Sequence, residues 1–212
     1  MQVTNFLTLV GGGAFGRELI NWANDAANAG SAPPLTGFID KSAQALDGFP
    51  YQLAYRGTIE DYTPVDGERL IVAIGEPEAK QRVVELLRAR GATFAGIVHP
   101  TAVIAKSARL GEGVVVCPLS LVSADAQVGD FVAINAMSSV GHDVKLGACS
   151  TLSAHVDLTG RVEVGTCCFF GTGAKVLPGV RIGEGAKIGA GTVIMRHVKP
   201  GSVMYTPPAK KL

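Results

Sequence analysis

A six-residue repeat occupies the second half of this 212-residue chain. Every sixth position from Val98 to Ile194 holds a large apolar residue, at 17 positions of 17, although apolar residues make up only 47% of the chain. The residues two positions earlier are small or β-branched, and glycine often follows the large residue. This period fits neither an α-helix nor a plain strand, but it is the period of a hexapeptide β-helix. The sequence therefore predicts stacked coils around one continuous apolar column, without an inserted loop.

The first half has a different organisation, in which strand-like runs alternate with helical spacing of apolar residues. Such alternation predicts a small parallel α/β sheet. We therefore expect two domains, a Rossmann-like α/β domain over residues 1–97 and an all-β domain, a parallel β-helix, over residues 98–212. The expected strands are 6–10, 35–39, 70–74 and 94–98, and the expected helices are 17–27 and 77–90.

Composition excludes several classes of protein. The 19 basic and 18 acidic residues give a net charge of +1, which argues against a protein that binds nucleic acid or an anionic membrane as its main task. The four cysteines form no CxxC pair, so we expect reduced thiols. No apolar run approaches the roughly 18 residues of a membrane span, and the N-terminus lacks a basic start. We expect a cytoplasmic protein.

A glycine loop follows the first expected strand and opens a helix. Gly11, Gly13 and Gly16 have the GxGxxG spacing, which lets a backbone approach phosphate at a helix N-terminus. Asp40 ends the next strand, and in a dehydrogenase this pairing would indicate NAD. A unit of under 100 residues suits a mononucleotide with a sugar attached better than a dinucleotide; a tight structural turn is the alternative. The residues that we assign to a nucleotide-sugar site are Gly13, Phe15, Gly16, Asp40, Lys41 and Gly75.

His142 is the strongest candidate for catalysis. It stands two residues after Val140 of the apolar column, so its side chain should lie outside the coils. Acyl transfer to an amine or hydroxyl needs a proton acceptor, and imidazole titrates near neutral pH. A surface histidine, or one packed at a seam between subunits, is the alternative. His155 and His197 lack partners at metal-ligand spacing, so we expect no metal.

The hexads resemble the left-handed β-helix of the hexapeptide acyltransferases, and the whole chain resembles the PglD/NeuD-type sugar acyltransferases. The resemblance implies an N-terminal nucleotide-sugar domain, a C-terminal acetyl-CoA domain, and a homotrimer with active sites between subunits. It also implies a place in bacterial polysaccharide biosynthesis, such as that of lipopolysaccharide O-antigen. The matching stretches are VGGGAFGRE at 10–18, FID at 38–40, VAIG at 72–75, IVHP at 97–100, IN at 134–135, SVGHD at 139–143 and PAK at 208–210.

The resemblance also implies roles for individual residues. Asp143 would orient the catalytic histidine, and Asn135 would bind the sugar or the attacking group, unless it is a corner residue of an asparagine ladder. Gly160 would donate its N–H to the oxyanion, with a plain turn glycine as the alternative. Thr172 and Ala190 would line the pantetheine arm of acetyl-CoA.

Several positions depart from the family pattern, and two of them bear on the predicted sites. Thr151 stands where some members have a second histidine that touches the cofactor, so we expect that contact to be weakened or absent. Phe15 stands where the family often has histidine, which puts side-chain contacts of the glycine loop in doubt.

The resulting hypothesis is an enzyme. It would transfer acetyl from acetyl-CoA to the amino group, at C4, of a UDP- or GDP-linked amino sugar, by direct attack with His142 as general base and Asp143 in support. Sugar O-acetylation of the sialic-acid type, with the same acetyl-CoA site, is the first alternative. A non-catalytic β-helix scaffold or a nicotinamide-binding module is the second.

Overall fold

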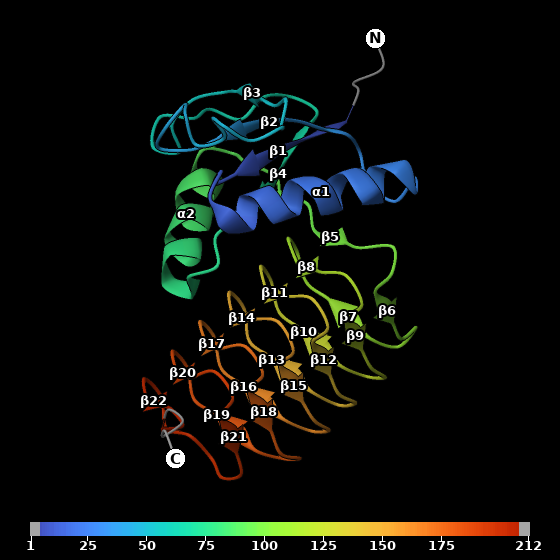
Figure 1. Cartoon of the computed structure of the whole chain (residues 1–212), viewed down its shortest axis with the longest axis vertical. Coiled ribbons are helices and arrows are strands. Elements are labelled where there is room, and N and C mark those ends of the chain that lie inside the picture. Colours follow the sequence, from blue (N-terminus) through green and yellow to red (C-terminus); the bar gives the residue numbers. More distant parts are fainter. Residues whose placement is uncertain (1–4, 208–212) are drawn as a thin grey trace.

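The computed structural model describes residues 5–207, which form a small α/β part stacked on one end of a column of coils (Figure 1). The C-terminal stretch 208–210, one of the stretches that match the family, lies outside the described residues. The α/β part and the left-handed parallel β-helix confirm the predicted fold class.

The α/β part is built on a four-stranded parallel sheet with the order β3-β2-β1-β4. Its strands β1 and β2 match the predicted ones, and β4 begins and ends two residues earlier than predicted. The two-residue strand β3 was not predicted. The sheet consists of β1 (Phe6–Val10), β2 (Leu35–Ile39), β3 (Ala54–Tyr55) and β4 (Glu68–Val72).

Two helices cover the sheet. Helix α1 (Ala14–Asn28) begins directly after the glycine loop and buries Leu19, Ile20 and Ala23 against one face. Helix α2 (Pro77–Ala89) begins with proline in its first turn, and the carboxylate of Glu76 accepts a hydrogen bond from the N–H of Ala79, which caps the helix. Both helices therefore start at the carboxyl edge of the sheet.

The expected strand at 94–98 is divided between the two parts, which corrects the prediction. Phe94 makes a single bridge to Leu70 of β4. Strand β5 (Ile97–Val98) instead pairs with β8 (Val115–Val116) and belongs to the β-helix. The glycine within the apolar run, Gly96, lies so close to Val114 that a Cβ would be 2.4 Å from its carbonyl oxygen. The chain thus passes from the sheet to the first coil at this glycine.

The β-helix has three faces, each a parallel sheet of two-residue strands that pair with strands 18 residues away, except for β20 and β22, which are 16 residues apart. We call them the first face (β5-β8-β11-β14-β17-β20-β22), the second face (β6-β9-β12-β15-β18-β21) and the third face (β7-β10-β13-β16-β19). In chain order the remaining strands are β6 (Val103–Ile104), β7 (Arg109–Leu110), β9 (Leu121–Val122), β10 (Gln127–Val128), β11 (Ala133–Ile134), β12 (Ser139–Val140), β13 (Lys145–Leu146), β14 (Thr151–Leu152), β15 (Asp157–Leu158), β16 (Glu163–Val164), β17 (Phe169–Phe170), β18 (Lys175–Val176), β19 (Arg181–Ile182), β20 (Lys187–Ile188), β21 (Val193–Ile194) and β22 (Val203–Met204).

The predicted apolar column fills the interior of the coils. From Val116 to Ile194 its members are buried, whereas Val98, Ile104 and Leu110 in the coils nearest the sheet are partly buried. At the corners the chain turns through the left-handed region: nine non-glycine residues, one in each successive hexad from Leu119 to Cys167, have φ between 54° and 61°. Because that conformation is costly for most residues, the stacked coils must hold it in place.

The two parts share apolar clusters. Val115 and Cys117 of the first face pack with α1 and the sheet, and Cys149 and Cys167 pack with α2. The four cysteine thiols are free and buried. No helix within residues 5–207 is long and apolar enough to cross a membrane.

Candidate active site

His142 and Asp143 lie at the corner that joins the second face to the third, between β12 and β13. Both side chains are about half exposed, and the Nδ1 of His142 lies 2.8 Å from the Oδ2 of Asp143. A carboxylate only accepts hydrogen bonds, so Nδ1 carries the hydrogen and the neutral imidazole keeps its lone pair on Nε2. Adjacent residues make this contact because Asp143 has a φ of 58°, which turns its side chain back to the ring.

Gly160 lies one coil below His142 at the same corner. A Cβ built on Gly160 would be 2.3 Å from the Nε2 of His142, so the imidazole packs directly over this glycine. The N–H of Arg161 donates to the carbonyl oxygen of His142 at 2.9 Å, whereas the N–H of Gly160 donates to no acceptor within residues 5–207. The corner therefore brings together an imidazole whose neutral form has its lone pair on Nε2 and a backbone N–H without an acceptor in the described residues. These are the two kinds of group that acyl transfer to a nucleophile uses.

Asn135, Thr172 and Ala190 lie together at a different corner, which joins the first face to the second. The side-chain oxygen of Asn135 accepts a hydrogen bond from the thiol of Cys117 at 3.5 Å. Thr172 and Ala190 are exposed and lie in the second and third coils below it. Within one chain strand β12 separates Asn135 from His142, so the structure does not bring these two predicted residues together.

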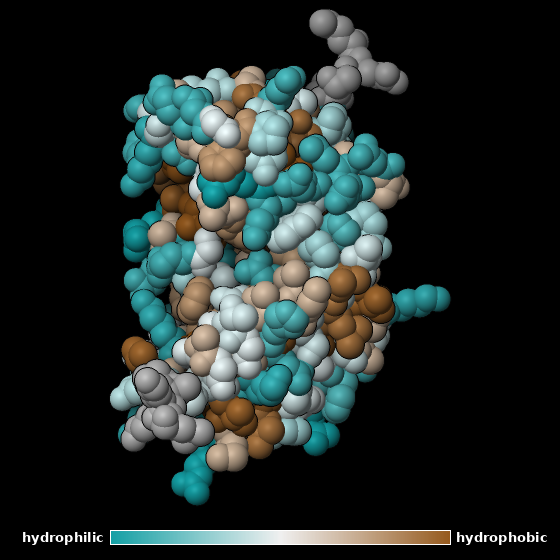
Figure 2. Space-filling view, viewed as in Figure 1, coloured by the Kyte–Doolittle hydropathy of each residue, from teal (hydrophilic) through white to brown (hydrophobic). Residues whose placement is uncertain are grey.

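The second face, which lies between these corners, carries exposed apolar side chains. Val103, Leu121 and Val193 are 62%, 42% and 51% exposed, and Leu119 and Met137 at the neighbouring corner are exposed by 60% and 51%. Figure 2 shows apolar side chains gathered at two places over the β-helix. A surface of this composition is typical of an interaction site.

The glycine loop meets Asp40 at the carboxyl edge of the sheet. The N–H of Gly12 donates to one carboxylate oxygen of Asp40 at 2.7 Å, and the N–H of Ser42 donates to the other at 3.0 Å. Gly13 and Gly75 follow β1 and β4, and a Cβ added to either glycine would meet no atom within 4 Å. In open parallel sheets a ligand binds where the strand order reverses, and here that point lies between β1 and β4.

The other residues assigned to the nucleotide-sugar site have different surroundings. A Cβ on Gly16 would be 2.1 Å from the carbonyl oxygen of Gly11, so this glycine is required for close packing of α1 on β1, which favours the structural alternative at this position. Phe15 is partly buried and packs against the apolar cluster of α1 and the sheet. Lys41 is exposed next to Asp40.

Lys80 of α2 is a residue that the sequence reasoning missed. Its buried ammonium donates to the carbonyl oxygen of Ser150 at 3.2 Å and to the hydroxyl of Thr151 at 2.9 Å. Burial lowers the pKa of Lys80 to about 8. Thr151 is therefore covered by α2. The sequence did indicate that Lys80 is buried, because it falls on the apolar stripe of α2 with Val84 and Leu87.

The thiols are poor candidates for chemistry. Burial raises the pKa of Cys117, Cys149, Cys167 and Cys168, to about 11 for Cys167. Since the thiolate is the nucleophile, these cysteines are unreactive. The described part of the chain also contains no cluster of three histidine, cysteine, aspartate or glutamate side chains able to hold a metal ion.

Comparisons with known proteins agree with this description. The family described as "Bacterial transferase hexapeptide (six repeats)" matches residues 161–196. The acetyltransferase domain of PglB from Neisseria gonorrhoeae FA1090 is 28% identical over 98% of this chain and 100% of that one, with a TM-score of 0.83, and it has also been solved with acetyl coenzyme A. A comparison with curated proteins finds no match.

PerB from Caulobacter crescentus, solved with CoA and GDP-perosamine, is 30% identical over 97% of this chain and 96% of that one, with a TM-score of 0.82. A variant of perosamine N-acetyltransferase from the same organism is 29% identical over the same shares, with a TM-score of 0.81.

Fold, corner geometry and these similarities define an acetyl-CoA-dependent acyltransferase built on hexapeptide repeats. Within that class, the chain belongs to the PglD/NeuD-type family of nucleotide-sugar acetyltransferases. The scaffold and nicotinamide-binding alternatives are thereby set aside.

Proposed function

We propose that this enzyme transfers acetyl from acetyl-CoA to the amino group at C4 of a nucleotide-linked amino sugar. The observation that carries the proposal is the exposed imidazole of His142, tied to Asp143 through Nδ1 and open at Nε2 above Gly160. The likeness to perosamine N-acetyltransferase favours an amine over a hydroxyl as the acceptor. We place the acetylated sugar in the biosynthesis of a surface polysaccharide.

The chemistry is a direct attack within a ternary complex. The amine attacks the thioester carbonyl while Nε2 of His142 takes its proton, and Asp143 supports the resulting imidazolium. The N–H of Gly160 donates to the oxyanion of the tetrahedral intermediate. The carbon–sulfur bond then breaks, the CoA thiolate leaves, and the proton held by His142 neutralises it. A covalent acyl-cysteine is disfavoured by the buried, weakly acidic thiols.

The nucleotide sugar would bind at the carboxyl edge of the sheet in residues 1–97. The diphosphate would lie at the N-terminus of α1, where Gly13 leaves the backbone N–H groups accessible, and the ribose would lie at Asp40. Phe15, Gly16 and Lys41 would shape this loop, and the sugar would extend past Gly75. Residues 98–212 would bind acetyl-CoA, with Thr172 and Ala190 along the pantetheine arm.

The complete site would need more than one chain. Asn135, near the nucleotide part, and His142 lie at different corners of the same protomer, so a neighbouring protomer must supply one of them. The exposed apolar side chains of the second face suit burial between subunits. We propose a homotrimer with three sites between protomers.

The test compares His142→Asn with a matched control, His197→Asn, which replaces another exposed histidine, in the last coils of the β-helix and away from the assigned residues. Thiol release is followed with acetyl-CoA and a panel of UDP-, GDP- and dTDP-linked 4-amino sugars, and product NMR locates the acetyl group. We expect kcat to fall roughly 100- to 10,000-fold in the first variant and to stay unchanged in the second, with the same assembly by light scattering. Unchanged kcat in a folded, assembled His142→Asn enzyme would reject the base assignment. An ester product would establish O-acetylation instead.

A further inference from the structure

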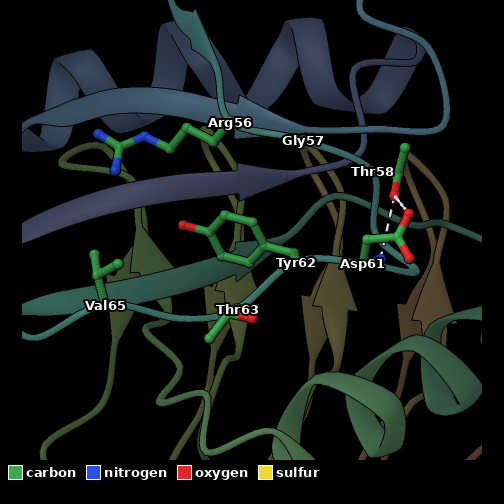
Figure 3. Close-up of a pocket in the computed structure, with 7 residues that line it drawn as sticks. All are labelled: Arg56, Gly57, Thr58, Asp61, Tyr62, Thr63 and Val65. Carbon is green, nitrogen blue, oxygen red and sulfur yellow. Dashed lines mark hydrogen bonds between the residues drawn. The ribbon is translucent and has the colours of Figure 1, made fainter.

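A hollow of about 580 Å³ opens beside the edge strand β3, outside the residues assigned above (Figure 3). Thr58 and Asp61 lie together at one end, and the side chain of Arg56 extends toward the other. Tyr62 forms part of the wall, and its hydroxyl donates to the buried carboxylate of Glu68 at 2.5 Å. This hydrogen bond holds the Tyr62 part of the wall in place.

This hollow is continuous with the end of β2. The N–H of Asp40 donates to the carbonyl oxygen of Gly57, which lines the hollow, at 3.3 Å. The hydroxyl of Tyr55, the last residue of β3, donates to the carbonyl oxygen of Asp40 at 3.2 Å. The sheet order β3-β2-β1-β4 places the diphosphate loop at β1 and the ribose carboxylate at β2. A nucleotide laid along this edge would therefore carry its base to β3.

Asp61 has the geometry of a fixed acceptor. Its Oδ2 accepts a hydrogen bond from the hydroxyl of Thr58 at 2.8 Å, and its own N–H donates to the same hydroxyl oxygen at 3.2 Å (Figure 3). Its Oδ1 accepts no hydrogen bond from residues 5–207. The side chain is exposed, and Asp61 is one of the residues that line the hollow.

A free carboxylate distinguishes the bases by their hydrogen-bonding edges. It accepts hydrogen bonds and donates none, so it needs a partner with adjacent donors. Guanine presents two neighbouring donors, N1–H and the 2-amino group. Uracil and thymine present one N–H between two carbonyl oxygens that would repel the carboxylate, and adenine and cytosine present an amino group beside a ring acceptor.

We propose that the hollow beside β3 binds the nucleobase and that Asp61 selects guanine, so that the substrate is a GDP-linked sugar. The inference rests on the proposed nucleotide site and extends it. Thr58 is the positioning residue, since its hydroxyl holds the carboxylate of Asp61.

The test measures binding of GDP, UDP, dTDP and xanthosine diphosphate to the full-length protein by calorimetry. We expect GDP to bind most tightly. Replacing Asp61 by Asn exchanges one acceptor for a donor, which suits xanthine because a carbonyl replaces its 2-amino group. Asp61→Asn should therefore weaken GDP binding roughly 10- to 100-fold and strengthen binding of xanthosine diphosphate. The control Asp66→Asn, an exposed carboxylate of the same loop outside the hollow, should change neither.

The inference is overturned if UDP or dTDP binds more tightly than GDP, if none of the four binds, or if Asp61→Asn leaves the ratio of GDP to xanthosine diphosphate affinity unchanged. Circular dichroism and retained acetyl-CoA binding show that the variant is folded. Guanine selection that depends on Asp61, without acetyl transfer to any amino sugar, would refute the proposed function and leave this inference standing. Acetyl transfer to a UDP-linked amino sugar alone would support the proposed function and refute this inference.

Discussion

Replacing the buried Lys80 by Met should remove a pH dependence from the stability of the fold. Lys80 is buried at the junction of α2 and the first face, and its pKa falls from 10.5 to about 8 because burial disfavours the charged form. That fall corresponds to about 3 kcal/mol of free energy at 1.36 kcal/mol per pH unit. Methionine has a similar shape and no charge, so it removes this penalty together with the hydrogen bonds to Ser150 and Thr151.

The sign of the effect follows from proton binding. Below pH 8 the folded and unfolded chains both hold the proton on Lys80, and the full penalty applies. Between pH 8 and 10.5 the unfolded chain binds a proton that the folded chain does not, so the free energy of unfolding rises with pH. The wild-type protein should therefore gain about 3 kcal/mol relative to Lys80→Met across this window.

Urea unfolding at pH 7.5 and pH 10.5, at a fixed protomer concentration, measures this difference. Titrating groups that do not interact with Lys80 cancel in the comparison of the two proteins. Arg82→Met, which removes an exposed charge from the same helix, is the control and should follow the wild type at both pH values. A difference between wild type and Lys80→Met that stays flat or falls with pH would refute the reasoning.

Three further substitutions test the site. Gly160→Ala should lower kcat for thiol release at least roughly 10-fold, because its Cβ displaces the imidazole of His142; full activity would show that the ring does not act from this position. Asp143→Asn keeps a residue that tolerates the left-handed corner, and kcat should fall roughly 10- to 100-fold; an unaltered rate would remove Asp143 from the mechanism. A Cβ at position 13 would meet no neighbouring atom, and Gly13 has an ordinary φ of −67°, so Gly13→Ala should leave the melting temperature unchanged. Calorimetry should show that the variant binds nucleoside diphosphate roughly 10-fold more weakly. A lower melting temperature with unchanged affinity would assign Gly13 to the fold alone.

The β-helix could be predicted because its repeat is local. Each hexad contributes one large inward residue and a smaller one two positions earlier, so the repeat over 98–194 predicts which side chains lie inside and that His142 lies outside. The same spacing places Asn135 and His142 at different corners, since they are seven residues apart and one strand lies between them. The family resemblance implied the contact between His142 and Asp143, but the repeat alone could not predict it, because it depends on the left-handed backbone of a single residue.

Long-range contacts were the other limit. Lys80 and Thr151 are 71 residues apart, and only the packing of α2 on the first face brings them together. Strand β3 has two residues and no alternation of apolar and polar side chains, so no sequence pattern predicts it. Yet β3 sets the outer end of the sheet and the position of the hollow beside it. The unpredicted parts are therefore those whose position depends on distant segments.

Each coil of the β-helix contains three hexads, or 18 residues, so the number of coils sets the length of the column. Each coil adds the spacing of neighbouring strands, about 4.8 Å, to the distance between the catalytic corner and the far end of the column. His142 and Gly160 need only two adjacent coils, so the coils below them extend the column without contributing to the catalytic corner. With the pantetheine arm beside Thr172 and Ala190 as proposed, adding or removing one whole coil would leave the reaction geometry intact. It would change the length of the pantetheine-linked acyl donor that the enzyme accommodates.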